Sequence, residues 1–390
     1  MGVMTVEMRR SLMKFIHTAD WHLGKLVHGV YMTEDQEYVL QKLIDLIKAE
    51  EPDALVIAGD LYDRSVPPTE AVKLLNDTLY TINVELGVPI IAISGNHDSG
   101  ERLSFGSSWY RHSKLYMKGK WERGSQAINI QGVRFHLVPF TEPGPIRELY
   151  EMPSITSHHE AMKVIVDDIK STIDQSVPNV LVGHAFVLGG KTTDSERTLS
   201  VGGSGCVGSE LFEHFDYTAL GHLHSPDAIS HDSIHYAGSL MKYSFSEARQ
   251  RKVVKIVEIM EKKVSVKERI LEPKRDMREL EGYLSELMSV EFYQNQKLDD
   301  YLKVILLDEG GLIDPMNQLK QLYPNVLHLE RKSAIRDRSL TGGSTDIHSR
   351  KKEGIDLFKR FYEDMTTTDW SSDKHEKVAA IINEVKAGRA

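Results

Sequence analysis

The chain of 390 residues contains a single cysteine, Cys206. One cysteine cannot close an intrachain disulfide, and nothing near it supplies the second thiolate of a structural zinc site. No apolar run approaches the roughly 18 residues that a membrane span needs. No basic segment followed by an apolar one has the form of a signal peptide. These absences favour a cytoplasmic protein in a reducing compartment, without a membrane anchor.

Positive charge is also scarce, because 48 Lys and Arg residues stand against 57 Asp and Glu, for a formal net charge of −9. Phosphate affinity rises with the number of cations brought to a nucleic-acid backbone, so this balance argues against indiscriminate nucleic-acid binding. A local basic groove or bound metal ions could still supply positive charge that a residue count misses. The chain also lacks a Gly-x-x-x-x-Gly-Lys-Ser/Thr loop, so any ATP dependence must come from a partner.

The remaining composition is that of a folded globular protein, with 41% hydrophobic and 27% charged residues. Such values argue against a largely disordered chain. The length leaves room for one large domain and one or two small ones, since single cores seldom grow beyond about 250–300 residues.

Apolar runs alternate with longer helical patterns through the first two thirds of the chain, which predicts a layered α/β domain. In such folds, ligands gather beyond the carboxyl ends of the strands, where several loops meet. We expect strands at 14–17, 54–58, 89–94, 133–138, 180–182, 217–220 and 234–236, with helices at 34–50 and 69–85.

The pattern changes after residue 271, where a helix at 277–288 and a strand at 301–307 indicate a small α/β domain. A polar stretch at 331–352 is typical of a mobile linker, and two amphipathic stretches follow it. Two short helices beyond a linker bury little apolar surface alone, so we expect them to bind a partner rather than pack back on the main domain. The expected division is 1–12 (extension, with translation from Met1 or Met13), 13–270 (main domain), 271–330 (small domain), 331–353 (flexible linker) and 354–390 (helical segment).

Five short segments that each follow an apolar strand carry Asp, Asn and His residues, and most contain a glycine that lets the backbone turn sharply. Alternate residues of an extended chain face the same side, so Asp-x-His and His-x-His pairs can both reach one point. Any one of these segments alone would be weak evidence for a metal site. The five are HTADWH at 17–22, GDLYDR at 59–64, GNHD at 95–98, GH at 183–184 and GHLH at 221–224.

The side chains of these segments offer carboxylate, amide and imidazole ligands without a thiolate, which suits Mn²⁺, Mg²⁺, Fe²⁺ or Zn²⁺. Seven ligands are too many for one ion that keeps a water, but they suit two ions that share a carboxylate, for which Asp60 is the natural bridge. Two such ions would hydrolyse a phosphoester by in-line attack. The seven candidates are Asp20, His22, Asp60, Asn96, His184, His222 and His224.

The ordered set of motifs resembles the calcineurin-like metallophosphoesterase superfamily, whose fold is a layered β-sandwich flanked by helices. Within it, three longer segments resemble the SbcD family, the nuclease subunits of bacterial SbcCD complexes, which are related to double-strand-break-repair nucleases. These segments are HTADWHLG at 17–24, GKTTDSER at 190–197 and GSLMKYSFSE at 238–247. The resemblance covers roughly Met13 to Val257, and the tail agrees in organisation only.

The resemblance implies a division of the ligands between two ions, most often Mn²⁺, with Mg²⁺ as the alternative. It implies that His97 is no ligand but faces the scissile phosphate, where it stabilises charge or protonates the leaving oxygen, with Asp98 able to orient its imidazole. One ion would be held by Asp20, His22, Asp60 and His224, and the other by Asp60, Asn96, His184 and His222.

The resemblance further implies a DNA exonuclease and hairpin- or end-processing endonuclease of DNA repair, recombination and replication, located with the bacterial nucleoid. It would act as a homodimer with an SbcC-like ATPase, in a heterotetramer. The helices of 354–390 would dock on the coiled coil of that ATPase, and the domain at 271–330 would help to hold DNA.

Two other functions remain open from the residues. A small-molecule phosphodiesterase or protein phosphatase could be built on the same metal centre, and a non-catalytic DNA-end scaffold could keep only a degenerate one. All seven ligand positions are filled, which weighs against the scaffold. Asp63 stands where some relatives have a histidine, which puts a direct catalytic role for it in doubt. Arg64 could contact phosphate or a carboxylate, and Lys191, Arg197 and Lys242 could line a DNA path, contact the partner or be merely solvated.

Overall fold

The computed structural model describes residues 12–196, 205–332 and 370–386, together with Ile355, Phe358, Lys359 and Tyr362. The chain divides into two compact units, residues 1–277 and 278–390, each of which is described by itself. The expected extension at 1–11, most of the linker at 331–353 and most of the first tail helix lie outside the described residues, as does Arg197.

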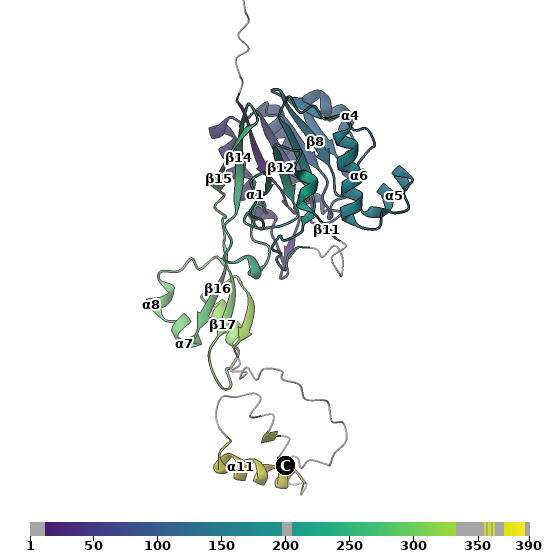
Figure 1. The fold of residues 1–390 in the computed structure, drawn as a ribbon. Helices are drawn as coiled ribbons and strands as arrows, with labels where there is room; N and C mark the ends of the chain where they lie inside the picture. Colours follow the sequence, from purple (N-terminus) through teal and green to yellow (C-terminus); the bar gives the residue numbers. More distant parts are fainter. Residues whose placement is uncertain are drawn as a thin grey trace, which may run out of the picture. The chain divides into compact units, whose positions relative to one another are not determined.

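The first unit contains a six-stranded sheet in the order β15-β14-β1-β4-β5-β6. Figure 1 labels β14 and β15 of this sheet. The four strands from β1 to β6 in this order run parallel, so their carboxyl ends lie at one edge, whereas β14 and β15 are antiparallel additions. The strands are β1 (Met13–Thr18), β4 (Ala54–Ala58), β5 (Ile90–Ile93), β6 (Leu115–Lys118), β14 (Val253–Met260) and β15 (Lys263–Ile270).

A second sheet of five strands follows the order β13-β12-β9-β8-β7. Neighbouring strands from β8 to β13 in this order are parallel, and β7 is antiparallel to β8. The strands are β7 (Ile128–Ile130), β8 (Val133–Val138), β9 (Asn179–His184), β12 (Tyr217–Gly221) and β13 (Ile234–Tyr236).

The two sheets pack face to face through a cluster of buried apolar side chains that both of them contribute. Phe15 of β1 contacts Phe135 of β8 edge to face, with ring centroids 5.4 Å apart, and contacts Tyr217 of β12 at 5.6 Å. Aromatic pairs favour this edge-to-face arrangement over direct stacking. The layered β-sandwich that the sequence motifs imply is therefore confirmed.

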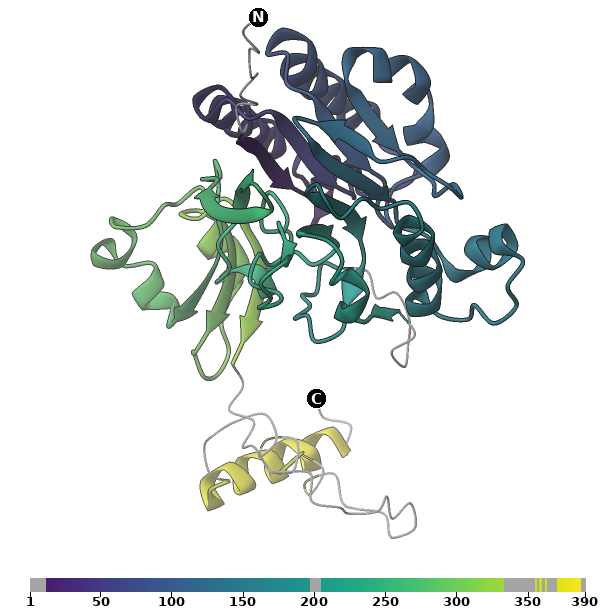
Figure 2. The same ribbon diagram turned by 45° about the horizontal axis from the view of Figure 1, so that its top comes forward.

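Helices cover both outer faces of the sandwich (Figure 2). On one side, α1 (Thr33–Glu50) buries Val39, Leu43 and Ile47, at the spacing of one helical face. The expected helix at 69–85 forms as α2 (Thr69–Tyr80), and its last turn is a π-helix at Thr81–Glu85.

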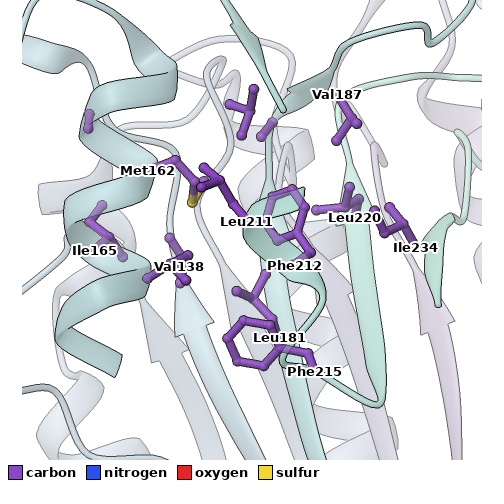
Figure 3. Close-up of a cluster of buried hydrophobic side chains, with 14 of the residues drawn as sticks. Val138, Met162, Ile165, Leu181, Val187, Leu211, Phe212, Phe215, Leu220 and Ile234 are labelled. Atoms are coloured by element: carbon purple, nitrogen blue, oxygen red, sulfur yellow. The ribbon is translucent and has the colours of Figure 1, made fainter. Parts of the chain in front are cut away.

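On the other outer face, α6 (His158–Lys170) lies against β8, β9 and β12 (Figure 3). Its Met162 and Ile165 point toward Val138 and Leu181 of the sheet, with Phe212 beside them. Ser157 starts the helix with a capping box, in which Ser157 and Glu160 satisfy each other's backbone N–H groups. These contacts hold β9 and β12, whose ends carry two of the histidine segments.

Shorter elements complete the first unit, and no helix among the described residues is long and apolar enough to cross a membrane. They are β2 (Leu26–Val27), β3 (Val30–Tyr31), α3 (Gly100–Ser104), α4 (Ser107–Tyr110), α5 (Pro143–Tyr150), β10 (Phe186–Val187) and β11 (Cys206–Val207), with 3₁₀ turns at Arg111–Ser113, Ser209–Phe212 and Phe245–Glu247.

The second unit has a three-stranded sheet in the order β16-β17-β18, with its own core around Leu302, Val304 and Tyr323. β17 and β18 are parallel. The elements are β16 (Met277–Gly282), α7 (Leu284–Leu287), α8 (Val290–Tyr293), β17 (Tyr301–Leu306), α9 (Pro315–Lys320), β18 (Val326–Arg331) and α11 (Ser372–Lys386).

The expected helix at 277–288 is wrong. Met277, Leu280, Leu284 and Leu287 have helical spacing, but the first half of the segment is strand β16 and only the second half is helix α7. Leu280 and Leu287 both reach the core of the small sheet. Gly282 separates the two halves, because a glycine is unfavourable inside a helix. The two compact units divide between Met277 and Arg278.

Candidate metal centre

The five sequence segments meet at the carboxyl ends of the strands. Asp20 and His22 follow β1, Asp60 follows β4, and Asn96 follows β5 in the first sheet. His184 is the last residue of β9, while His222 and His224 follow β12 in the second sheet. The Asp and His side chains of this set are almost fully buried, with exposures of 0–4%.

Four of these residues have a backbone conformation that L-amino acids rarely adopt. Asp20, His22 and Asp60 have φ values of 52°, 46° and 52°, and His222 has 100°. Such conformations cost of order 1–3 kcal/mol each and persist where the surroundings over-determine them. Here, the backbone N–H of Asp20 donates to the Gly59 carbonyl at 3.0 Å, and that of His22 donates to the Asp60 carbonyl at 2.9 Å. The loops are therefore locked in a geometry that serves the side chains.

Two motif glycines are required by close packing against these side chains. A Cβ atom added to Gly59 would lie 2.3 Å from His184 Nδ1, and Gly59 also has a φ of +91°. A Cβ atom added to Gly95 would lie 2.1 Å from the Asp60 carboxylate. The glycines thus let three loops approach one another closely enough for their polar side chains to meet.

The polar atoms converge in three overlapping groups whose members lie within 4.8 Å of one another. His22 Nε2 is 3.0 Å from His224 Nε2 in the first of them. Asp60 Oδ2 is 3.6 Å from His22 Nε2 and 3.5 Å from His184 Nε2, so one carboxylate oxygen lies between two imidazoles. The groups are Asp20 with His22 and His224, Asp20 with Asp60 and His184, and His22 with Asp60 and His97.

Asn96 joins the two histidines of the second sheet. Its Oδ1 is 2.9 Å from His184 Nε2 and 3.0 Å from His222 Nδ1. His184 Nδ1 lies 2.9 Å from the Ala58 carbonyl, which can only accept, so a proton resides on Nδ1. In a neutral His184, Nε2 and Asn96 Oδ1 would then both be acceptors facing each other. A cation satisfies such an arrangement, and the oxygen and nitrogen donors fit a divalent metal ion.

The charges of the centre are tightly coupled. Burial would raise the pKa of Asp60, but His184, His22 and His97 hold it well below its usual value. Burial raises the pKa of Asp20 to about 7 despite the nearby His184 and His224. For His184, burial acts to lower the pKa, but the Asp60 and Asp20 carboxylates raise it to about 9. The raised pKa of His184 favours a proton on its Nε2, which lies 2.9 Å from Asn96 Oδ1 and 3.5 Å from Asp60 Oδ2.

His97 lies beside this group with its ring edge on His22, at 4.6 Å between ring centroids. Its Nδ1 is 2.8 Å from the Asp63 carbonyl, which keeps a proton on that nitrogen. The hydrogen bond that orients the ring thus comes from Asp63, not from the Asp98 carboxylate as expected. Asp98 instead accepts backbone N–H groups of Leu61, Tyr62 and Gly95 at 2.9–3.1 Å, so it joins the Asp60 loop to the Asn96 loop.

Two supporting residues were not anticipated from the sequence. Gln36 is fully buried on α1, and its amide donates to the His22 carbonyl at 2.8 Å and accepts from Gly24 N–H at 3.0 Å. Tyr243 donates to the Trp21 carbonyl and accepts from Gln36 at 3.0 Å. Gln36 continues the apolar stripe of the helix, and a polar residue in such a stripe is the signal that could have revealed it.

The charged residues whose roles the sequence left open are mostly engaged in contacts that support the fold. Asp63 pairs with Lys25 at 2.7 Å and lies 3.8 Å from His22 Nδ1. Arg64 is half exposed, 3.8 Å from the Asp63 carboxylate. Lys242 donates to the Ala248 carbonyl at 2.7 Å and pairs with Asp276 at 2.9 Å, two contacts that support the fold. The Lys191 side chain is exposed.

A two-layer sandwich with buried Asp and His groups at its strand ends is the arrangement of a dimetal phosphoesterase. A model of the calcineurin-like phosphoesterase family matches residues 13–226, and a model described as the type 5 capsule protein repressor C-terminal domain matches 273–366. The SbcD subunit of the nuclease SbcCD from Staphylococcus epidermidis is 36% identical over 372 residues, covering 95% of this chain and 98% of the relative.

A crystal structure of a dimetal phosphatase from Danio rerio covers 65% of this chain and 98% of its own, with 9% identity and a TM-score of 0.34, an overlap too loose to bear on the assignment. The chain belongs to the calcineurin-like phosphoesterases and, within them, to the SbcD nuclease subunits, which are phosphodiester hydrolases.

The affinity for a divalent metal ion should rise with pH, because an ion bound at this centre would compete with the proton on His184. Below a pKa of about 9 that proton competes, so apparent affinity should increase up to about tenfold per pH unit between pH 7 and 9. The free energy of unfolding of the metal-free chain should instead fall as the pH rises. The raised pKa of His184 contributes stability that is fully present below 6.5 and lost as pH rises through about 9.

Calorimetric Mn²⁺ titrations and thermal unfolding at several pH values measure both trends. His184→Asn should flatten the pH dependence of Mn²⁺ binding, whereas His112→Asn, at an exposed site, should leave it unchanged. A pH-independent Mn²⁺ affinity in the wild-type chain would contradict the proton exchange at His184.

Proposed function

We propose that this chain cuts DNA at double-stranded ends and hairpins, as an exonuclease and endonuclease, with two Mn²⁺ ions in the strand-end site. The observation that carries the proposal is the position of Asp60 Oδ2 between His22 and His184, at 3.6 and 3.5 Å. One carboxylate oxygen placed between two imidazoles is suited to bridging two ions. DNA as the substrate is supported by the likeness to the staphylococcal SbcD nuclease over nearly the whole chain.

Each ion has a set of ligands in this proposal. One set is Asp20, His22, Asp60 and His224, three of which form a single group in the structure. The other set is Asp60, Asn96, His184 and His222, in which Asn96 Oδ1 contacts both histidines. Four imidazoles among seven ligands favour Mn²⁺ over Mg²⁺, because Mg²⁺ prefers oxygen ligands.

A pair of bound divalent ions would lower the pKa of an attacking water and offset charge on the phosphate. The chain's own residues then arrange the reaction. Asp60 orders the centre, since its Oδ1 accepts the backbone N–H of His97 at 2.8 Å. That bond and the Asp63 carbonyl fix the His97 ring, so Nε2 is the nitrogen that would exchange a proton with the leaving oxygen. His97 keeps 9% exposure, against 0% for His22, which suits contact with a substrate.

The substrate class is tested by incubating the chain with Mn²⁺ and either a hairpin-ended duplex or a chromogenic phosphodiester. We expect cleavage of the DNA, with the small ester cut more slowly, because a nuclease contacts the backbone on either side of the cut. Activity confined to the small ester would instead support the small-molecule phosphodiesterase alternative. A phosphoserine peptide as a third substrate distinguishes a protein phosphatase.

His97→Ala should reduce DNA cleavage by about 10²–10⁴-fold, the usual contribution of a general acid. The backbone N–H that Asp60 accepts is retained in alanine, so Mn²⁺ binding should change little. Gel assays of cleavage and calorimetric Mn²⁺ titrations give the two readouts. His112→Ala, at an exposed position, is the matched control. Cleavage at the wild-type rate would remove His97 from the mechanism.

The tail is proposed to bind an SbcC-like ATPase, in a heterotetramer with two copies of this chain in the bacterial cytoplasm. Trp370 packs against Tyr362 and Phe358, at 5.4 and 6.1 Å between ring centroids. Ile381 on α11 remains 58% exposed, and Phe358 42%. Exposed apolar side chains beside an aromatic cluster suit a helical partner.

A contact between two copies of the chain is supported by Phe105 and Trp109 in the first unit. The two rings are neighbours, and each is about 70% exposed.

Deleting residues 354–390 should abolish co-purification with the ATPase and leave metal-dependent cleavage of short DNA intact. Ile381→Asp should weaken the same association, because it places a charge on the exposed apolar position. Glu376→Lys, at an exposed polar position of the same helix, is the control. Pull-down and cleavage are measured on the same preparations. Undiminished association of the truncated chain would refute the docking role.

A further inference from the structure

The imidazole of His224 is held on its Nδ1 side by two residues outside the seven-ligand set. The Ser195 hydroxyl lies 2.7 Å from His224 Nδ1 and is hydrogen-bonded to the Glu247 carboxylate. Glu247 Oε1 is itself 3.4 Å from the same nitrogen. The other nitrogen of the ring, Nε2, faces His22 at 3.0 Å. One side of the ring thus faces the metal centre and the other faces a serine and a carboxylate.

Glu247 is fully buried and forms an ion pair with Lys252, whose Nζ lies 2.6 Å from its Oε2. Lys252 is 6% exposed and is also within hydrogen-bond distance of the His224 carbonyl, Ser239 and Gln250, at 2.8–2.9 Å. An ammonium in direct contact keeps a buried carboxylate ionised. An ionised carboxylate accepts hydrogen bonds and cannot donate them.

This contact fixes the direction of the hydrogen bonds that link Glu247, Ser195 and His224. The Ser195 hydroxyl must donate to Glu247, because the carboxylate has no proton to offer. The serine oxygen therefore accepts, and His224 Nδ1 is the nitrogen that carries the proton. His224 Nε2 is left with its lone pair, directed at the metal centre, which is the form of imidazole that binds a metal ion.

The backbone of His224 is held by the same parts of the chain. Its N–H donates to Glu196 Oε1 at 2.7 Å, and its carbonyl accepts from Lys252 Nζ at 2.8 Å and from Ser239 N–H at 3.2 Å. Thr193 N–H in turn donates to the Glu196 carboxylate at 2.9 Å. Residues of the segments 190–197 and 238–247, together with Lys252, therefore form a support for one histidine.

The support of His224 differs from that of the other two histidines described above. His184 and His97 each direct Nδ1 at a backbone carbonyl, of Ala58 and of Asp63. Those carbonyls are neutral, whereas the Ser195 hydroxyl that contacts His224 is itself hydrogen-bonded to the negatively charged Glu247 carboxylate. Carboxylates behind a ligating imidazole fix its tautomer and raise its strength as a donor, and their loss typically costs about 10–100-fold in metal affinity.

We propose that Ser195 and Glu247 are positioning residues that hold His224 with its lone pair on Nε2 and strengthen its bond to one of the two ions. The inference rests on the proposed ligand role of His224. It assigns a role to residues of the two segments 190–197 and 238–247.

The decisive variant is Ser195→Ala in the full chain, because it removes the bridging hydroxyl and leaves the buried pair of Glu247 and Lys252 in place. Calorimetric Mn²⁺ titration should show one of the two ions bound about 10–100-fold more weakly and the other unchanged. Nitrogen-15 NMR of the histidines in the metal-free chain should show His224 protonated on Nδ1 in the wild type and a mixture of tautomers in the variant. Ser195→Thr should restore both properties, since threonine keeps the hydroxyl.

Ser246→Ala is the matched control. Ser246 lies next to Glu247 in sequence, but its Oγ is hydrogen-bonded to Asp194 N–H and to the Ser244 hydroxyl rather than to His224. An unchanged Mn²⁺ titration in Ser195→Ala, or a wild-type His224 protonated on Nε2, would overturn the inference and leave the proposed nuclease intact. A wild-type chain that binds no Mn²⁺ would instead overturn the proposed function, so the two failures are distinguishable.

Discussion

A carboxylate buried away from water must be met by cations or hydrogen-bond donors, and Asp60 is the carboxylate around which the rest of this structure is arranged. Its Oδ1 accepts a backbone N–H from the Asn96–His97 loop, and its Oδ2 lies between histidines of two different sheets. Position 95 requires glycine, because the Asp60 carboxylate occupies the space that a Cβ atom would need. Positive φ angles at the ligand loops follow from the same requirement, since several chains have to approach one small polar group.

Much of this arrangement could be predicted from the sequence, because buried parallel strands have continuous apolar runs and end at glycine and polar residues. The expected strands at 54–58, 133–138 and 234–236 coincide with β4, β8 and β13. The spacing of Asp-x-His and His-x-His then indicated which side chains could share a point, and the structure brings all seven together. Their division between two ions is a proposal that the geometry supports through Asp60.

The rest depended on contacts between distant segments, which local patterns do not reveal. The segment 277–288 has helical spacing, but β17 offers its first half a neighbouring strand and Gly282 interrupts the helix. Asp98 follows His97 in sequence, yet its carboxylate is turned toward the backbone of the Asp60 loop. Glu247 lies 23 residues from His224, and Lys252 contacts both the Glu247 carboxylate and the His224 carbonyl. Tertiary packing decided each of these outcomes.

The hydrogen bonds of the metal centre cross between the two sheets of the sandwich. Asn96, after a strand of the first sheet, contacts His184 and His222 of the second, and His222 N–H donates to the Asp20 carboxylate at 3.0 Å. The metal centre therefore also joins the two sheets of the β-sandwich at the carboxyl ends of their strands. A substitution at Asn96 or Asp20 should therefore weaken the contact between the two layers as well as disturb the metal centre, because the hydrogen bonds of these residues join one sheet to the other.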